Sequence, residues 1–180
     1  MPLFERWRAE RDLQRKAAAY VASLFVEPPQ EDVDWLAGEG TAGDEDHARW
    51  ELRYARRALG LLAAQRDALD DRTASAVAHA LASSFEKDPA IAPGMAELAE
   101  RQFNARLTTY RDALGSRSAD GARVRLGRAL LGFAGDMIAQ KGPSAQGGEI
   151  LVRYLDEANG ALGGAFGIAA LPEDRAPSEI

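Results

Sequence analysis

One long amphipathic segment, residues 44–71, constrains the fold most, because it is the longest uninterrupted helical pattern in the chain. At helical spacing its apolar side chains fall within an arc of about 120°. Asp44 is a favourable N-cap residue, and Glu45 and Asp46 place negative charge at the positive end of the helix dipole. The pattern predicts a central helix against which the other segments pack. The predicted buried arc contains Trp50, Tyr54, Ala58, Leu61, Leu62, Gln65, Ala68 and Leu69, and Arg49, Arg53, Arg56 and Asp67 are predicted to face solvent.

The rest of the chain also has helical periodicity and no run typical of a strand. Pro28-Pro29 is expected to end the first helix, Asp70 and its neighbours to cap the one after residue 71, and Gly142-Pro143 to end another. We therefore predict an all-α fold, a single-domain bundle of five to seven helices over residues 1–171, with a flexible tail at 172–180. Whether residues 160–171 are helical is left open. The other expected helices cover residues 3–26, 32–37, 73–87, 94–117, 120–141 and a stretch beginning at Ser144, with one extra turn after Asp88-Pro89.

Several positions within these helices carry specific expectations. Trp7 belongs to the buried stripe of the first helix, whereas Phe4 lies outside it and is free to contact another segment or another subunit. Arg106 points into the apolar arc of the helix at 94–117, so it needs either an acidic partner or a path along which its long side chain reaches water. Glu51 and the acidic turn around it are one candidate partner. Glycine is costly inside a helix, so the glycines of the segment at 120–141 suggest close contact with another helix or with a flat ligand. These are Gly127, Gly132 and Gly135.

Composition excludes several classes of protein. The chain has 180 residues, 46% of them hydrophobic and 28% charged, as in ordinary globular domains. It has no cysteine, which rules out disulfides, thiol catalysis and cysteine-bound zinc. The N-terminal residues lack the apolar core of a signal peptide, and the longest uncharged run, 158–172, is too short to span a bilayer. We therefore expect a cytoplasmic protein without a membrane segment.

Charge is unevenly distributed along the chain, although the net charge is only −6. Residues 27–51 contain nine acidic residues against one arginine, and residues 101–128 contain seven arginines against two aspartates. Blocks of opposite sign can meet within a chain or between subunits. The basic block could contact phosphates, but it has few aromatic residues for stacking and the protein is acidic, so nucleic acid is not the expected partner.

A metal site is the one chemical constellation that the sequence suggests. Asp44, His47 and Glu51 share a helix face, and a carboxylate three residues before a histidine occurs in di-metal helical bundles. The other histidine, His79, has Ala76 at the corresponding position, so the second half of such a site is missing. In a bundle enzyme with a site at Asp44, His47 and Glu51, Arg106 or His79 would be possible partners of these residues. The competing interpretation is an acidic first turn with a solvated His–Glu pair, and His79 is expected to face solvent.

No motif assigns a catalytic activity. The chain lacks a phosphate-binding loop with a Lys-Ser/Thr pair, a Gly-x-Ser-x-Gly nucleophile elbow and an N-terminal helix-turn-helix, and it resembles no family by its motifs. Our hypothesis is a non-enzymatic helical module that binds another protein or itself, without a cofactor and most simply as a homodimer. The alternative is a small-molecule- or metal-binding helical-bundle enzyme with a site near Asp44, His47 and Glu51. Wide apolar faces on the first helix and on the segment at 120–141 suggest self-association.

Overall fold

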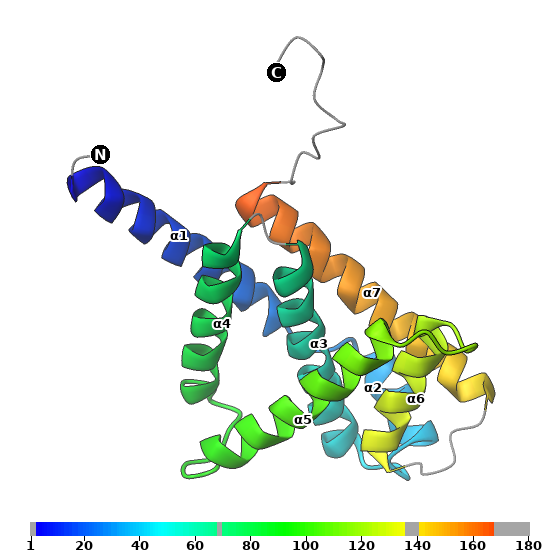
Figure 1. Cartoon of the computed structure of the whole chain (residues 1–180). Coiled ribbons are helices and arrows are strands. Elements are labelled where there is room, and N and C mark those ends of the chain that lie inside the picture. The colour runs from blue at the N-terminus through cyan, green and yellow to red at the C-terminus, as the bar shows by residue number, and fades with distance from the viewer. Residues whose placement is uncertain (1–2, 68–69, 136–140, 168–180) are drawn as a thin grey trace, which may run out of the picture.

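The computed structural model describes residues 3–67, 70–135 and 141–167, and these residues form seven helices and no strand (Figure 1). The prediction of an all-α bundle of five to seven helices is confirmed. None of the helices in the described ranges is both long and apolar enough to cross a bilayer. The predicted tail at 172–180 lies outside the described residues. The helices are α1 (Leu3–Leu24), α2 (Gln30–Glu39), α3 (Glu45–Asp67), α4 (Asp71–Glu86), α5 (Ala96–Gly115), α6 (Ala122–Ala134) and α7 (Lys141–Phe166).

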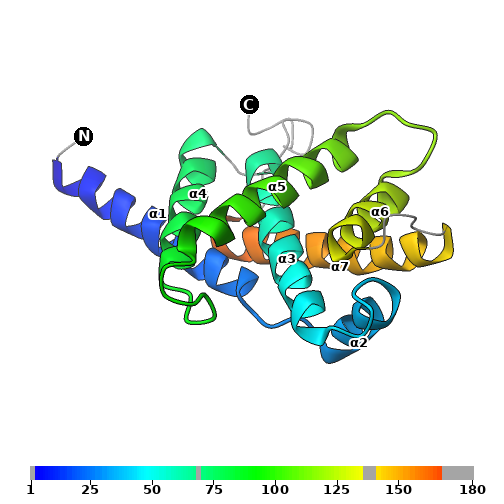
Figure 2. The same ribbon diagram turned by 90° about the horizontal axis from the view of Figure 1, so that it is seen from below.

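Helix α3 lies at the centre of the fold and contacts all six other helices, as the sequence predicted (Figures 1 and 2). Its predicted solvent face, however, is largely covered. The side chains of Arg53 and Arg56 are only 15% and 13% exposed, because Glu27 and Glu157 pair with them from the edges of the bundle. A central helix needs apolar or paired side chains all around, and here the pairing partners come from distant segments.

Two aspartates begin helices as predicted. Asp44 Oδ1 accepts a hydrogen bond from the backbone N–H of His47 at 2.9 Å. Asp70 Oδ1 accepts one from the backbone N–H of Thr73 at 2.7 Å, which starts α4. Each carboxylate satisfies a backbone donor that has no partner within its helix. Local sequence therefore determines where α3 and α4 start.

Two predictions about helix ends are wrong. The helix expected over 120–141 ends at Ala134, because Gly135 takes a left-handed conformation with φ of 111°. Gly142-Pro143, the predicted stop, instead lies in the first turn of α7. Proline is tolerated there because backbone N–H groups in the first turn have no partner within the helix, so the missing N–H costs no hydrogen bond. The turn expected after Asp88 is present, closed by Ile91 N–H to Asp88 O at 3.0 Å, and a second turn follows, closed by Met95 N–H to Ala92 O at 3.0 Å. Residues 160–166, left open by the sequence, are helical.

Helices α6 and α7 cross at a glycine contact. A Cβ atom on Gly127 would lie 1.8 Å from the backbone oxygen of Ser144, and one on Gly148 would lie 2.1 Å from that of Arg123. Neither helix can approach this closely with a side chain at the crossing. The prediction of close helix contact holds for Gly127, whereas Gly132 has open space beside it and Gly135 ends the helix. The contribution of Gly148 was not predicted.

The apolar surface of α6 is covered within the chain. Leu126, Leu130 and Leu131 are 0–1% exposed, and α6 contacts α2, α3, α5 and α7. The apolar side of α6 is therefore used within the chain, whereas residues 136–140 of the predicted segment lie outside the described residues and self-association stays a prediction.

Tyrosine hydroxyl groups are distributed through the core. Tyr20 donates a hydrogen bond to the backbone oxygen of Gly60 at 2.8 Å, and Tyr154 donates one to Asp32 Oδ2 at 2.7 Å. Tyr110 is fully buried, and its hydroxyl has no hydrogen-bond partner among the described residues. Burial raises the pKa of all three phenols, and of Tyr54, above the ordinary value near 10.

Alkaline titration is therefore expected to unfold the protein as its tyrosines ionise. The pKa of each phenol is higher in the folded state than in the unfolded state, so the resulting stabilisation is complete below about pH 10 and is lost as the pH rises further. Phenolate absorbance and helical circular dichroism should change together. A gradual rise in phenolate absorbance near pH 10 with full helicity retained would contradict this prediction.

Candidate functional site

The three residues of the predicted metal site are close in sequence but have separate roles. The Asp44 carboxylate caps α3. His47 Nε2 lies 3.4 Å from Glu51 Oε1, with the histidine side chain 42% exposed. His79 is exposed in a shallow depression between α1 and α4, which it lines with Glu10. In the ranges described, no three His, Asp or Glu side chains come together as a possible metal site. Metal binding near Asp44 stays a hypothesis.

Arg106 and Glu51 form a buried ion pair between α5 and α3. Arg106 is 7% exposed and Glu51 is 2% exposed. Arg106 Nε donates to Glu51 Oε2 at 2.9 Å, and Nη2 donates to Oε1, so the contact is bidentate. Nη1 donates to the backbone oxygen of Gln102 at 3.1 Å. The guanidinium carbon lies 4.4 Å from the ring centre of Phe133 and 5.1 Å from that of Tyr54. The predicted pairing is confirmed, and each charge has the partner that burial requires.

A second buried ion pair, Arg57 with Asp88, was not predicted. Arg57 Nη2 donates to Asp88 Oδ2 at 2.7 Å, and the two side chains are 3% and 6% exposed. The guanidinium carbon of Arg57 lies 3.9 Å from the ring centre of Phe25 and 5.0 Å from that of Phe85. Burial lowers the pKa of Arg57, and the neighbouring carboxylate opposes that shift. Because Asp88 Oδ1 also accepts from the backbone N–H of Ala90 at 3.0 Å, this pair ties the α4–α5 connection to α3.

The opposite charge blocks meet at one point. Among the described residues, Glu51 with Arg106 is the ion pair that links residues 27–51 to residues 101–128. Other members of the two blocks are paired elsewhere within the chain: Asp32 is buried against Arg153, and Arg125 donates to the backbone oxygens of Ala113 and Ser116. These members of the blocks therefore stabilise the bundle internally, and contact between the blocks of two subunits stays a prediction.

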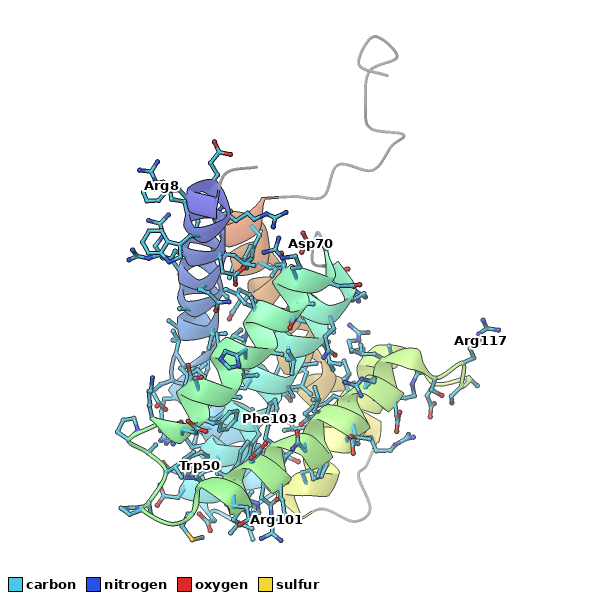
Figure 3. The ribbon with its side chains drawn as sticks, turned by 60° about the vertical axis from the view of Figure 1, so that its left-hand side comes forward. Arg8, Trp50, Asp70, Arg101, Phe103 and Arg117 are labelled. Atoms are coloured by element: carbon cyan, nitrogen blue, oxygen red, sulfur yellow. The ribbon has the colours of Figure 1, made fainter. Side chains whose placement is uncertain are left out.

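An apolar groove opens between α4 and α5. Leu81 and Phe85 of α4, Phe103 and Leu107 of α5, and Leu61 of α3 line a space of about 340 Å³. The Phe85 and Phe103 ring centres are 4.9 Å apart and join the two walls at the base. Figure 3 shows the labelled Phe103 between α4 and α5. The groove exists because these two helices diverge from their connection and nothing in the described chain fills the space between them (Figure 1).

The edges of this groove are acidic. Glu86 of α4 and Glu97 and Glu100 of α5 line it and are exposed. Within the part of the chain that the structure describes, none of the three forms an ion pair. Nearby on α5, Met95 and Leu98 are also exposed, at 44% and 38%. An apolar floor edged by three unpaired carboxylates is the chemical complement of an apolar segment flanked by positive charge.

The N-terminal part of α1 extends beyond the bundle (Figures 1 and 2). Residues 4–11, which we call the N-terminal arm, are all exposed. Phe4 and Trp7 are 60% and 53% exposed, and the centres of their rings lie 6.0 Å apart. The guanidinium carbons of Arg8 and Arg11 each lie 4.7 Å from one of these rings, on Phe4 and Trp7 respectively. The prediction that Trp7 is buried is wrong, because the helix continues past its neighbours and no segment among the described residues covers this end.

Comparison with known proteins adds no functional assignment, because no family model, curated protein or solved structure matches the chain. The functional interpretation therefore depends on the groove and the arm. The sequence indicated Phe4 of the arm as a possible contact with another subunit, but it did not predict the groove. The exposed aromatic residues were visible in the sequence, but the acidic edge of the groove combines Glu86 with Glu97 and Glu100 from another helix, and only the angle between α4 and α5 brings them together.

Proposed function

We propose that the protein is a non-enzymatic helical module that binds an amphipathic polypeptide helix in the groove between α4 and α5. The observation that supports this function is the open apolar floor around Phe103 with Glu86, Glu97 and Glu100 at its edges. Helix-in-groove recognition uses apolar side chains spaced three or four residues apart, which suits an apolar groove between two helices. The cysteine-free composition fits a reducing compartment such as the cytoplasm.

The two parts of the groove should contribute differently to binding. Burying a large apolar side chain on the floor contributes about 1.5–3 kcal/mol. Each exposed pair with an edge glutamate contributes only about 0.2–1 kcal/mol. Affinity is therefore expected to come mainly from the apolar anchors, and selectivity for basic over acidic segments from the glutamates.

A designed peptide can test this function. We expect a fluorescently labelled helical peptide with leucine on one face and lysine at its flanks to bind the protein, and a matched peptide with glutamate flanks to bind more weakly. Ala82 is exposed and lines the groove, so Ala82→Arg fills the site and offsets part of its negative charge without disturbing the core. Fluorescence anisotropy should show at least tenfold weaker binding, a loss of about 1.4 kcal/mol or more.

The matched control is Ala105→Arg. Ala105 is an exposed alanine on α5 that does not line the groove, and arginine there adds the same bulk and charge to the protein. It should leave peptide affinity within about twofold of the unmodified chain. Equal losses in the two variants, or no binding of the lysine peptide to the unmodified protein, would contradict the proposed function.

A further inference from the structure

We propose that the groove of one molecule holds the N-terminal arm of a second copy of the same chain, and that the exchange is reciprocal. This inference names the partner for the groove and so depends on the proposed function. It commits to a two-fold dimer with two identical arm–groove contacts, because each chain supplies one arm and one groove.

The arm has the chemistry that the groove requires. At helical spacing, Phe4, Trp7, Arg8 and Arg11 occupy one arc of about 100°, and the acidic residues of the arm, Glu5 and Glu10, lie outside it. The two rings are neighbours, and the guanidinium groups of Arg8 and Arg11 lie over them, so aromatic and cationic groups share one surface. In the part of the chain described, neither Arg8 nor Arg11 forms an ion pair. Figure 3 shows Arg8 at the free end of α1.

The groove offers the opposite charges and the same kind of apolar surface. Its floor contains two aromatic rings, Phe85 and Phe103, against which the arm's rings can pack. Glu97 and Glu100 lie one turn apart on α5, and Arg8 and Arg11 have the same three-residue spacing on α1. Two helices laid side by side can therefore form both pairs at once.

A molecule cannot place its arm in its own groove. Arg72 at the start of α4 pairs with Glu10 at 2.8 Å, and the rings of Phe85 and Phe25 near the ends of the two helices have centres 5.9 Å apart. Helices α1 and α4 thus run in parallel, and the arm extends past the beginning of α4. The groove lies toward the end of α4, roughly 20 Å away at a rise of about 1.5 Å per residue. A second molecule must supply the arm.

Charge reversal tests the exchange directly. The arm variant is Arg8→Glu with Arg11→Glu, and the groove variant is Glu97→Arg with Glu100→Arg; all four residues are exposed, so folding should be unaffected. In either variant alone, both contacts of the dimer become repulsive. In an equimolar mixture, the acidic arm of one variant meets the basic groove of the other, and the remaining arm and groove match as in the unmodified protein. Reciprocal exchange therefore predicts that mixing restores the dimer.

Sedimentation of the full chain at micromolar concentration provides the measurement. We expect the unmodified chain, with a monomer mass of 19.4 kDa, to be dimeric, each variant to dissociate with a Kd raised at least tenfold, and the mixture to recover the dimer. The dimer should also weaken as salt rises, because exposed charge pairs are screened. An unmodified monomer, a dimer insensitive to both variants, or a mixture that stays monomeric would overturn the proposal.

The peptide assay separates this proposal from the one on which it depends. If the chain is monomeric but the lysine-flanked peptide binds in a way that Ala82→Arg abolishes, the groove is a binding site for another protein and the exchange of arms is wrong. If neither the arm nor the peptide binds, the proposed function fails as well.

Discussion

Replacing Arg106 by methionine is expected to lower the free energy of unfolding by about 3–5 kcal/mol, because it leaves the Glu51 carboxylate buried without its charged partner. Methionine retains most of the side-chain length, so the packing against Phe133 and Tyr54 is largely preserved. The loss of stability therefore comes mainly from removing the positive charge. Urea unfolding followed by circular dichroism measures the effect.

The double variant Arg106→Met with Glu51→Leu is the control for this prediction. Removing both charges also removes the cost of burying either of them, and such replacements are often neutral or stabilising. We therefore expect the double variant to recover most of the stability that either single change loses. If the single change costs less than about 1 kcal/mol, or if the losses simply add, Glu51 and Arg106 are not a coupled buried pair.

Gly127→Ala is expected to destabilise the protein by about 3 kcal/mol, which is large for the addition of one methyl group. The new Cβ would lie 1.8 Å from the Ser144 oxygen and 2.5 Å from the Gly148 nitrogen, so α6 and α7 must move apart. The atoms in the way belong to the backbone of another helix and cannot rotate aside as a side chain could. Thermal or urea unfolding of the variant provides the measurement.

Gly132→Ala is the matched control in the same helix. A Cβ there has no neighbour within 4 Å, so alanine brings only its better helix propensity, worth up to about 1 kcal/mol. We expect this variant to be as stable as the unmodified chain or slightly more stable. Similar destabilisation by both substitutions would show that the glycine contact between α6 and α7 is not the cause.

The buried ion pairs also support the candidate groove. Arg106 lies one turn after Phe103 on α5 and fixes that wall to α3, and Arg57 stacks on Phe85 while holding Asp88 at the α4–α5 connection. The walls of the groove are thus attached to the central helix by charge pairs rather than by contact with each other over their full length.

The sequence by itself determined the features that depend on nearby residues or on periodicity. Helical spacing predicted an all-α bundle around α3, and the short carboxylates of Asp44 and Asp70 predicted the starts of two helices. An arginine in an apolar arc requires a buried partner, so Arg106 could be matched to Glu51. These results follow from local backbone hydrogen bonding and from the cost of an unpaired buried charge, which do not depend on the full arrangement of the chain.

Only the tertiary structure decided which predicted surfaces are covered and which stay open. An apolar stripe shows which side of a helix can be buried but not how far the neighbouring helices extend. Trp7 was therefore predicted to be buried, but it is exposed because α1 extends past the beginning of α4. Arg53 and Arg56 are covered by Glu27 and Glu157 from distant segments. Gly127 and Gly132 have the same low intrinsic preference for a helix, yet of the two only Gly127 lies where α7 crosses α6. The groove likewise depends on the angle between α4 and α5. Burial is set by contacts between residues far apart in the chain, and the periodicity of a single helix contains no information about these contacts.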